Sequence, residues 1–362
     1  MDEIKEKEKR VNEFLVKNKF DGLIITKRNN FAWITAGKDN HVVSGSESGI
    51  ANVLITKNKK FVITNNIELE RIKQEELSDQ NFEFVSYYWF EPKNSLDTLV
   101  KLAGGPNIVS DDNIPGTKTV SLIELQYPLT VNEIERYRWL GEQSSKCLTE
   151  VCKEIKPGQT EYNVAGDISS TLLSKGIYPE VILIASDDRI FKYRHPIPTN
   201  KKIKKYVMVV VCAQKYGLIV SLTRLVHFGK LTKEIKLKHE SVTKIDASFI
   251  LNSKPGTVIG DVFKKAKHMY KETGYANEWK LHHQGGPTGY NTRDYLVTEN
   301  SQEILVNNRA LAWNPSITGT KSEDTIIVNE KDNLILTSAY NWPMIKVELD
   351  IGIIDRPDIL VK

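Results

Sequence analysis

The sequence predicts a two-domain protein, with a small α/β domain over residues 1–127 and an α+β domain over residues 128–362. The chain has 362 residues, and a prior of about 100 to 200 residues per domain favours two domains. In the first third, helical and strand-like hydrophobic patterns alternate. After residue 127, two helical patterns come first and strand-like patterns dominate later, which is typical of helices packed on a mostly antiparallel sheet.

The first domain contains regular hydrophobic patterns separated by polar turns. In chain order these are the helical spacing of Val11, Phe14 and Leu15, the strand DGLIIT (21–26), the hairpin VLITKNKKFVIT (53–64) turning at Asn58, and the helix IELERIKQEEL (67–77). Turn-forming residues are then concentrated in AGGPNIVSDDNIPG at 103–116. We therefore place the end of this domain at about residue 127.

The second domain opens with two predicted helices. Thr130 is followed three positions later by Glu133, which is the pattern of a capping box. Apolar residues then recur at helical spacing: Ile134, Tyr137, Leu140, Cys147, Leu148, Val151 and Ile155. The stretch KPGQTE (156–161) ends this helix, and its Thr160 can cap the next one.

The rest of the second domain is richer in strands. A strand pair is predicted over 206–226, with a turn near Lys215 to Gly217. One further helix is predicted over about 258–273, and strand patterns follow it.

Composition and charge exclude several classes of protein. The net charge of +4 is small for this length, and the run KKIKK at 201–205 is interpreted as a solvated loop, so we expect no nucleic-acid partner. The N-terminal stretch lacks the apolar core of a signal peptide, and nothing downstream reaches the roughly 18 apolar residues of a membrane span. Three cysteines without CxxC spacing fit a reducing compartment. We therefore predict a cytoplasmic protein without a membrane partner.

Two adjacent histidines, His282 and His283, raise the question of a metal site, because neutral histidine is the commonest metal ligand. In an extended segment, successive side chains point to opposite faces, so only one of the two is expected to face a pocket. We predict that His282 is structural and hydrogen-bonded on the other face of the sheet.

Four polar segments of the second domain carry a family resemblance: FKYRHPIP with His195, LHHQGGPTGY with His283, AWNPSITG with Asn314, and GTKSEDTIIV with Glu323. In this order they resemble the creatinase, prolidase and aminopeptidase P (M24) family. RNNFAWITAG at 28–37 also looks like the Asn-x-x-Tyr-Leu-Thr-Gly segment of that family. The resemblance implies a pita-bread fold for 128–362, a creatinase-type N-terminal domain for 1–127, and a homodimer.

Peptidases of this family hold two divalent metal ions with two aspartates, one histidine and two glutamates. By resemblance, these ligand positions fall on Val210, Ser221, His283, Asn314 and Glu323. Only the histidine and the last glutamate are kept. A pair of manganese or zinc ions brings four positive charges into a partly dehydrated pocket, and such a pair needs anionic oxygen ligands close by to replace lost water. We therefore expect no metal cofactor, although a single ion on His283 and Glu323 is conceivable.

The residues that are kept still allow acid–base chemistry. His195 matches the nonmetal histidine that creatinase, a metal-free relative, uses for proton transfer. The resemblance thus implies that His195, His283 and Glu323 are catalytic residues of a metal-independent hydrolase or lyase acting on a small C–N-bonded substrate. A histidine oriented by a carboxylate can act as a general base near neutral pH.

Four further side chains are predicted to contact the substrate: Tyr290, Arg293, Asn314 and Lys321. Lys321 stands where the peptidases carry arginine. Because three acidic ligands are missing, the pocket should be less anionic than theirs, and we expect an anionic small ligand, such as a carboxylate.

Two other functions stay open. The same fold occurs in chaperone and scaffold proteins without peptidase activity, so the chain could be a catalytically silent protein that binds a ligand or a partner. The overall similarity also fits an Xaa-Pro dipeptidase or aminopeptidase.

Overall fold

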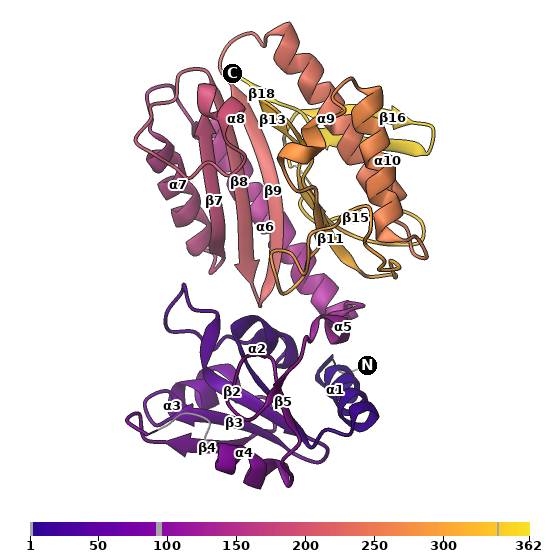
Figure 1. Ribbon diagram of the computed structural model, residues 1–362. Helices are drawn as coiled ribbons and strands as arrows, with labels where there is room; N and C mark the ends of the chain where they lie inside the picture. The colour runs from indigo at the N-terminus through magenta and orange to yellow at the C-terminus, as the bar shows by residue number, and fades with distance from the viewer. Residues whose placement is uncertain (1–2, 92–95, 339) are drawn as a thin grey trace. The chain divides into compact units, whose positions relative to one another are not determined.

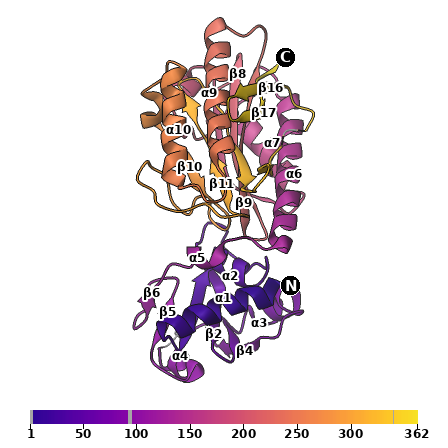
Figure 2. The same ribbon diagram turned by 90° about the vertical axis from the view of Figure 1, so that its right-hand side faces the viewer.

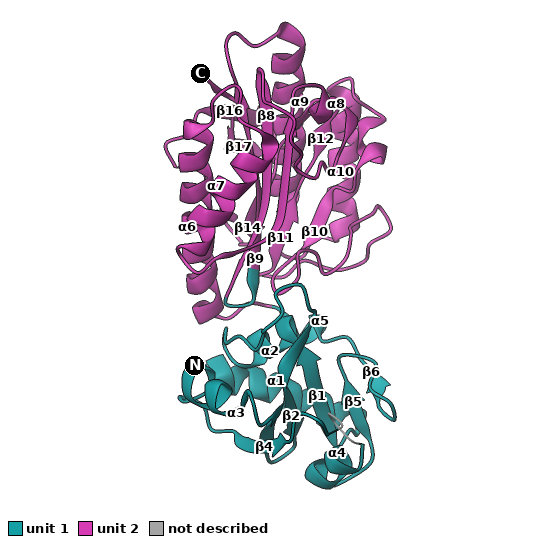
Figure 3. Ribbon diagram, turned by 90° about the vertical axis from the view of Figure 1, so that its left-hand side faces the viewer, with its two compact units in different colours: residues 1–127, 216–218 teal, residues 128–215, 219–362 magenta. Residues whose placement is uncertain are grey.

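The computed structural model describes residues 3–91, 96–338 and 340–362. The chain divides into two compact units, residues 1–127 with 216–218 and residues 128–215 with 219–362 (Figure 3). Within the described ranges, none of the helices is both long and apolar enough to cross a membrane.

Unit 1 is built on a six-stranded mixed sheet with the strand order β4-β3-β2-β1-β5-β6 (Figure 1). Its strands are β1 (Gly22–Lys27), β2 (Ser48–Thr56), β3 (Lys60–Asn65), β4 (Glu83–Tyr87), β5 (Ile108–Ser110) and β6 (Lys118–Thr119). Its helices are α1 (Glu3–Asn18), α2 (Arg28–Ile34), α3 (Leu69–Arg71), η1 (Ile72–Glu76), α4 (Leu96–Ala103) and α5 (Ile123–Gln126). α4 packs on β2 and β5, and its Leu99 joins a core that includes Ile24, Leu54 and Phe61.

The predicted elements of this unit are confirmed where the hydrophobic pattern was strong. DGLIIT forms β1. The predicted hairpin is β2 and β3, which pair antiparallel, and the amide of Thr56 donates to the carbonyl of Lys59 across the turn at Asn58 (2.9 Å). IELERIKQEEL is helical as α3 and η1.

The described part of unit 2 contains two four-stranded sheets, and a pair of long helices packs on each. The first sheet has the order β18-β9-β8-β7. Its strands are β7 (Tyr178–Ser186), β8 (Tyr206–Lys215), β9 (Leu218–His227) and β18 (Leu360–Val361). Helix α6 (Val131–Glu154) contacts β8, and helix α7 (Glu161–Leu173) contacts β7, so both helices cover this sheet (Figure 1).

The second sheet has the order β10-β11-β14-β15. Its strands are β10 (Gly285–Pro287), β11 (Ala310–Trp313), β14 (Asp324–Ile327) and β15 (Leu334–Ile335), and two hairpins accompany it: β12 (Ser316–Ile317) with β13 (Thr320–Lys321), and β16 (Met344–Leu349) with β17 (Gly352–Pro357). Helices α9 (Lys233–Asn252) and α10 (Ile259–Glu272) lie side by side against this layer (Figure 2). Phe249 of α9 stacks on Trp313 with ring centroids 4.5 Å apart, in the middle of the core.

The helices predicted from Thr130, Thr160 and residues 258–273 are confirmed as α6, α7 and α10. Helix α9 was not predicted from the sequence. Its buried face carries His239, Thr243 and Asp246 between apolar residues. The apolar spacing from which a helix is predicted is therefore weak in this segment. His239 and Asp246 have hydrogen-bond partners that are distant in the sequence, and such partners are not visible in a local pattern.

The capping box of α6 gives a first test of this fold. Thr130 Oγ1 accepts from the amide of Glu133 (3.3 Å), and Glu133 Oε2 accepts from the amide of Thr130 (2.7 Å). Thr130→Ala should therefore lower the free energy of unfolding by about 1 kcal/mol. Urea denaturation measures this loss, with Val131→Ala as the control because Val131 is 69% exposed. An equal loss in both variants would contradict a specific role of the cap.

Candidate functional site

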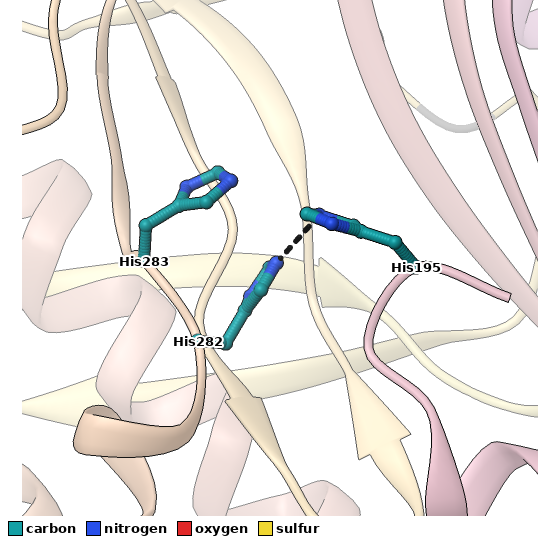
Figure 4. A group of neighbouring side chains, drawn as sticks. All are labelled: His195, His282 and His283. Carbon is teal, nitrogen blue, oxygen red and sulfur yellow. Dashed lines mark hydrogen bonds between the residues drawn. The ribbon is translucent and has the colours of Figure 1, made fainter.

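Three histidines, His195, His282 and His283, converge from two segments that are far apart in the sequence (Figure 4). We call them the histidine cluster. One ring nitrogen of each lies within 4.8 Å of those of the other two. The Nε2 atoms of His195 and His282 are 3.1 Å apart, at hydrogen-bonding distance, and the rings of His282 and His283 have centroids 4.4 Å apart.

An ion pair joins the two segments that carry the cluster. Arg194, in the loop after α8 (Asp188–Lys192), donates to Glu278 Oε2 at 2.8 Å. Glu278 begins the 3-10 helix η2 (Glu278–Leu281), which ends immediately before His282. Arg194 directly precedes His195, and Glu278 lies in η2, directly before His282 and His283. The ion pair therefore holds the loop that carries His195 against the segment that carries the other two histidines.

The two adjacent histidines both face the cluster, so the prediction that His282 points to the opposite face is wrong. η2 ends at Leu281 and β10 begins only at Gly285, so the alternation of a regular strand does not apply between them. Gln284 fixes the irregular backbone, because its Nε2 donates to the carbonyl of His282 (2.6 Å) and its Oε1 accepts from the hydroxyl of Tyr270 (2.8 Å).

Burial and neighbouring cations keep the cluster neutral. Burial, reinforced by Lys321, lowers the pKa of His282 to about 2. Burial and then Arg293 lower the pKa of His283 to about 4. Burial and Lys321 also bring the pKa of His195 below its ordinary value. At neutral pH these imidazoles therefore carry lone pairs that can accept a proton.

Glu323 is buried between two cations. Its Oε2 lies 2.7 Å from Lys321 Nζ and accepts from Thr223 Oγ1 at 2.6 Å, and its Oε1 lies 3.2 Å from Arg293 Nη2. The side chains of Lys321 and Glu323 are only 4% and 2% exposed. Burial alone would raise the pKa of Glu323, but Lys321 and Arg293 lower it below its usual value, so the carboxylate is ionised.

Arg293 also contacts a second polar position of this region. Its Nη1 donates to Ser221 Oγ at 3.1 Å, and the same hydroxyl lies 3.3 Å from Cys212 Sγ. Val210 lies on β8 in an apolar cluster with Leu183 and Met208. The region therefore has one carboxylate facing two cations.

Asn314 follows β11, next to the segment that carries His283. Its amide donates to the carbonyl of Gln284 (3.1 Å), whereas its buried Oδ1 has no hydrogen-bond partner among the residues that the structure describes. The side-chain oxygen is therefore a buried acceptor whose hydrogen-bonding capacity is unused by these residues.

The profile of metallopeptidase family M24 matches residues 135–330, which is more than half of the chain. The chain belongs to metallopeptidase family M24. An uncharacterized peptidase of Staphylococcus aureus strain MW2 is 24% identical over 333 residues, covering 84% of this chain and 94% of the relative. The predicted family resemblance is thus confirmed.

Solved structures agree with this M24 assignment at the level of the fold. The Xaa-Pro dipeptidase from Bacillus anthracis superposes with a TM-score of 0.77 at 17% identity, covering 99% of this chain and 100% of that chain. The N-terminal domain of a FACT complex subunit from Cicer arietinum gives 0.68 at 12% identity, covering 93% and 97%. The predicted fold class, an α+β pita-bread domain after an α/β N-terminal domain, is confirmed.

The structure brings most of the predicted site residues of this M24 protein into two adjoining groups. His195 and His283 meet in the histidine cluster, whereas Arg293, Lys321 and Glu323 meet beside Ser221. The groups adjoin, since His282 and Lys321 line the same small cavity. The hydroxyl of Tyr290 donates to Glu133 Oε1 (2.7 Å) at the start of α6.

Four contributors to the site were not recognised in the sequence: Arg194, Glu278, His282 in its observed role, and Gln284. The available signal was weak. Arg194 and Gln284 are direct neighbours of candidate histidines, but the pairing of Arg194 with Glu278 spans 84 positions, and no local pattern contains it.

Proposed function

We propose that this M24 protein does not assemble the two-metal centre of the family's peptidases. The observation that carries this proposal is that Arg293 contacts both Ser221 and Glu323, which are two of the five ligand positions. Two divalent ions would add four positive charges beside Arg293 and Lys321, against one carboxylate. Val210 and Asn314 supply no anionic oxygen that could offset them.

As its activity we propose metal-independent, creatinase-like hydrolysis of a small C–N-bonded substrate that carries an anionic group. Lys321 and Arg293 together exceed the charge of Glu323, so the site keeps a net positive charge that favours a carboxylate on the substrate. Asn314 Oδ1 accepts a hydrogen bond from the substrate.

His195 serves as the general base in this proposal because it is exposed and neutral. It takes a proton from the attacking water and returns it to the leaving nitrogen. His282 keeps the ring of His195 in place through the 3.1 Å contact, and His283 lies beside them.

We also propose a cytoplasmic homodimer in which residues 1–127 form the creatinase-type N-terminal domain and residues 128–362 the pita-bread domain.

A catalytically silent binding protein is the second candidate. The absence of carboxylates at three of the five ligand positions favours it, because an enzyme of this family without them has to rely on imidazoles alone. An Xaa-Pro dipeptidase is the third candidate function, and the fold that this chain shares with the Bacillus anthracis enzyme supports it. Two tightly held manganese ions per chain, found by elemental analysis of the purified protein, would favour this third candidate and refute the proposal.

Ligand soaking followed by mutation tests the proposed activity. Crystals soaked with small amides, guanidino acids and dipeptides should show ordered density beside His195 for an anionic member of the set. With that compound as substrate, His195→Ala should lower turnover by about 10²- to 10⁴-fold, because the general base is lost.

His268→Ala is the matched control, since His268 is an exposed histidine on α10 paired with Glu272. It should keep full turnover, and a chelator should not lower the wild-type rate. Full turnover by His195→Ala would remove the proposed catalytic role. A site that binds the compound without turning it over would favour the silent binding protein.

A further inference from the structure

We propose that His195, His282 and His283 together bind a single late transition-metal ion, such as Zn²⁺ or Co²⁺. This site differs from the two-metal ligand set of the family, because only His283 belongs to both. The ligands are three imidazoles with no carboxylate among them (Figure 4).

The spacing of the ring nitrogens is close to what one ion requires. Zn–N bonds of 2.0–2.1 Å in a tetrahedron place two nitrogens about 3.4 Å apart. The Nε2 atoms of His195 and His282 are already 3.1 Å apart. The largest separation in the cluster, 4.8 Å, has to shorten by about 1.4 Å to reach the tetrahedral value. His195 is exposed on a loop, so its side chain can rotate towards the other two imidazoles.

The protonation state of the cluster suits a metal ion. Ligating histidines have to present a ring nitrogen with a free lone pair to the ion. The buried Nδ1 atoms of His282 and His283 have no hydrogen-bond partner in the described part of the chain. Since no partner fixes the tautomer of His283, either of its ring nitrogens can present a lone pair to an ion.

Ligand chemistry decides which ions bind. Imidazole suits zinc, copper, nickel and cobalt, whereas manganese and magnesium prefer carboxylate and water oxygens. A cluster of three nitrogens without an acidic oxygen should therefore prefer Co²⁺ and Zn²⁺ over Mn²⁺. This order of preference separates the site from an oxygen-rich two-metal centre.

The surrounding charges predict a fourth, exogenous ligand. Arg194, Arg293 and Lys321 act on the cluster, and their counter-charges are Glu278 and Glu323, so one positive charge is left over. A divalent ion here needs an anion to offset that charge, and three protein ligands leave the fourth tetrahedral position open for it. The Nδ1 atoms also lack the acceptors that usually strengthen zinc ligands by 10- to 100-fold, so binding should be reversible.

Ion binding would regulate the activity proposed above, and this consequence rests on that proposed function. The lone pair of His195 that accepts a proton from water is the one that would bind the ion. The two roles exclude each other, so an ion in the cluster acts as an inhibitor.

Cobalt binding to the full chain tests the site. Metal-free protein is dialysed against Co²⁺ alone and bound cobalt is counted, while visible absorption reports the coordination. The expected result is one ion per chain with the strong bands of tetrahedral cobalt, which shift when azide occupies the open position. Mn²⁺ should not compete at equal concentration.

Variants locate the ion. His195→Ala removes an exposed ligand with little risk to folding, and His282→Gln removes a buried one; each should weaken binding by more than about 10-fold. His268→Ala should bind cobalt like the wild type. Failure of the wild type to bind cobalt, or unchanged binding in both cluster variants, would overturn this site and leave the proposed function standing. Two bound Mn²⁺ ions per chain would instead overturn the proposed function.

Discussion

Glu323→Gln should lower the free energy of unfolding by about 3–5 kcal/mol, because it leaves buried cations without their counter-charge. Glu323 is the carboxylate partner of both Lys321 (2.7 Å) and Arg293 (3.2 Å). The substitution keeps the shape of the side chain and removes only its charge. Denaturant unfolding of the metal-free protein measures the loss. If Glu323 mainly bound a metal ion, Glu323→Gln would lower the unfolding free energy of the metal-loaded protein and leave that of the metal-free protein nearly unchanged.

A matched exposed pair provides the control. Glu348 lies 3.3 Å from Lys346, and both side chains are more than 60% exposed, so Glu348→Gln should cost no more than about 1 kcal/mol. Adding Lys321→Met to Glu323→Gln should recover part of the stability, since one of the two unpaired cations is then removed. A neutral effect of Glu323→Gln alone would show that the carboxylate does not neutralise these cations.

The segment that carries Glu323 is held from both sides, which explains why its geometry is fixed. Lys321 and Glu323 are in the site, while the intervening Ser322 donates to Asp246 Oδ2 (2.5 Å). Asp324 pairs with Arg356 (2.6 Å), which also contacts Asp246. Asp246, one of the buried polar residues that weaken the apolar pattern of α9, thus helps to fix the position of the segment that carries Glu323.

The regular part of the fold was predictable because its signals are local. The strand β1, the β2–β3 hairpin and the capped helices α6 and α7 each depend on a hydrophobic period or a cap within a few residues. The missed helix α9 lacks such a signal, because residues such as Asp246 are satisfied by partners 76 and more positions away.

The candidate site was predictable as a set of residues but not as a geometry. Family motifs pointed to His195, His283 and Glu323, and the absence of three acidic ligands can be counted from the sequence. The direction of His282 depends on an irregular stretch between η2 and β10, and the position of Arg293 depends on contacts 72 and 30 residues away. Both follow from packing, which a linear pattern does not contain.

Acidification should destabilise the protein well before its carboxylates titrate. The pKa values of His282 and His283 are lowered to about 2 and about 4, against 6.5 in the unfolded chain. Between pH 6.5 and these values the unfolded state binds more protons, so stability falls as the pH falls. With some screening at the partly exposed His283, the two groups should cost about 3 kcal/mol between pH 7.5 and pH 5. The buried His239, whose pKa is also lowered, adds to this slope in the same direction.

His282→Gln isolates the contribution of the cluster, because glutamine does not titrate. The charged groups that face the cluster are Arg194, Arg293, Lys321 and Glu323, and all four are present in both proteins. Glu323, whose pKa is lowered, stays ionised above pH 5. Unfolding free energies at pH 7.5 and pH 5 should therefore differ by about 2 kcal/mol less in His282→Gln than in the wild type. His268→Gln, at an exposed histidine, should keep the wild-type difference. Equal differences in wild type and His282→Gln would mean that His282 is not held neutral by its surroundings, and the basis for neutral lone pairs in the histidine cluster would be lost.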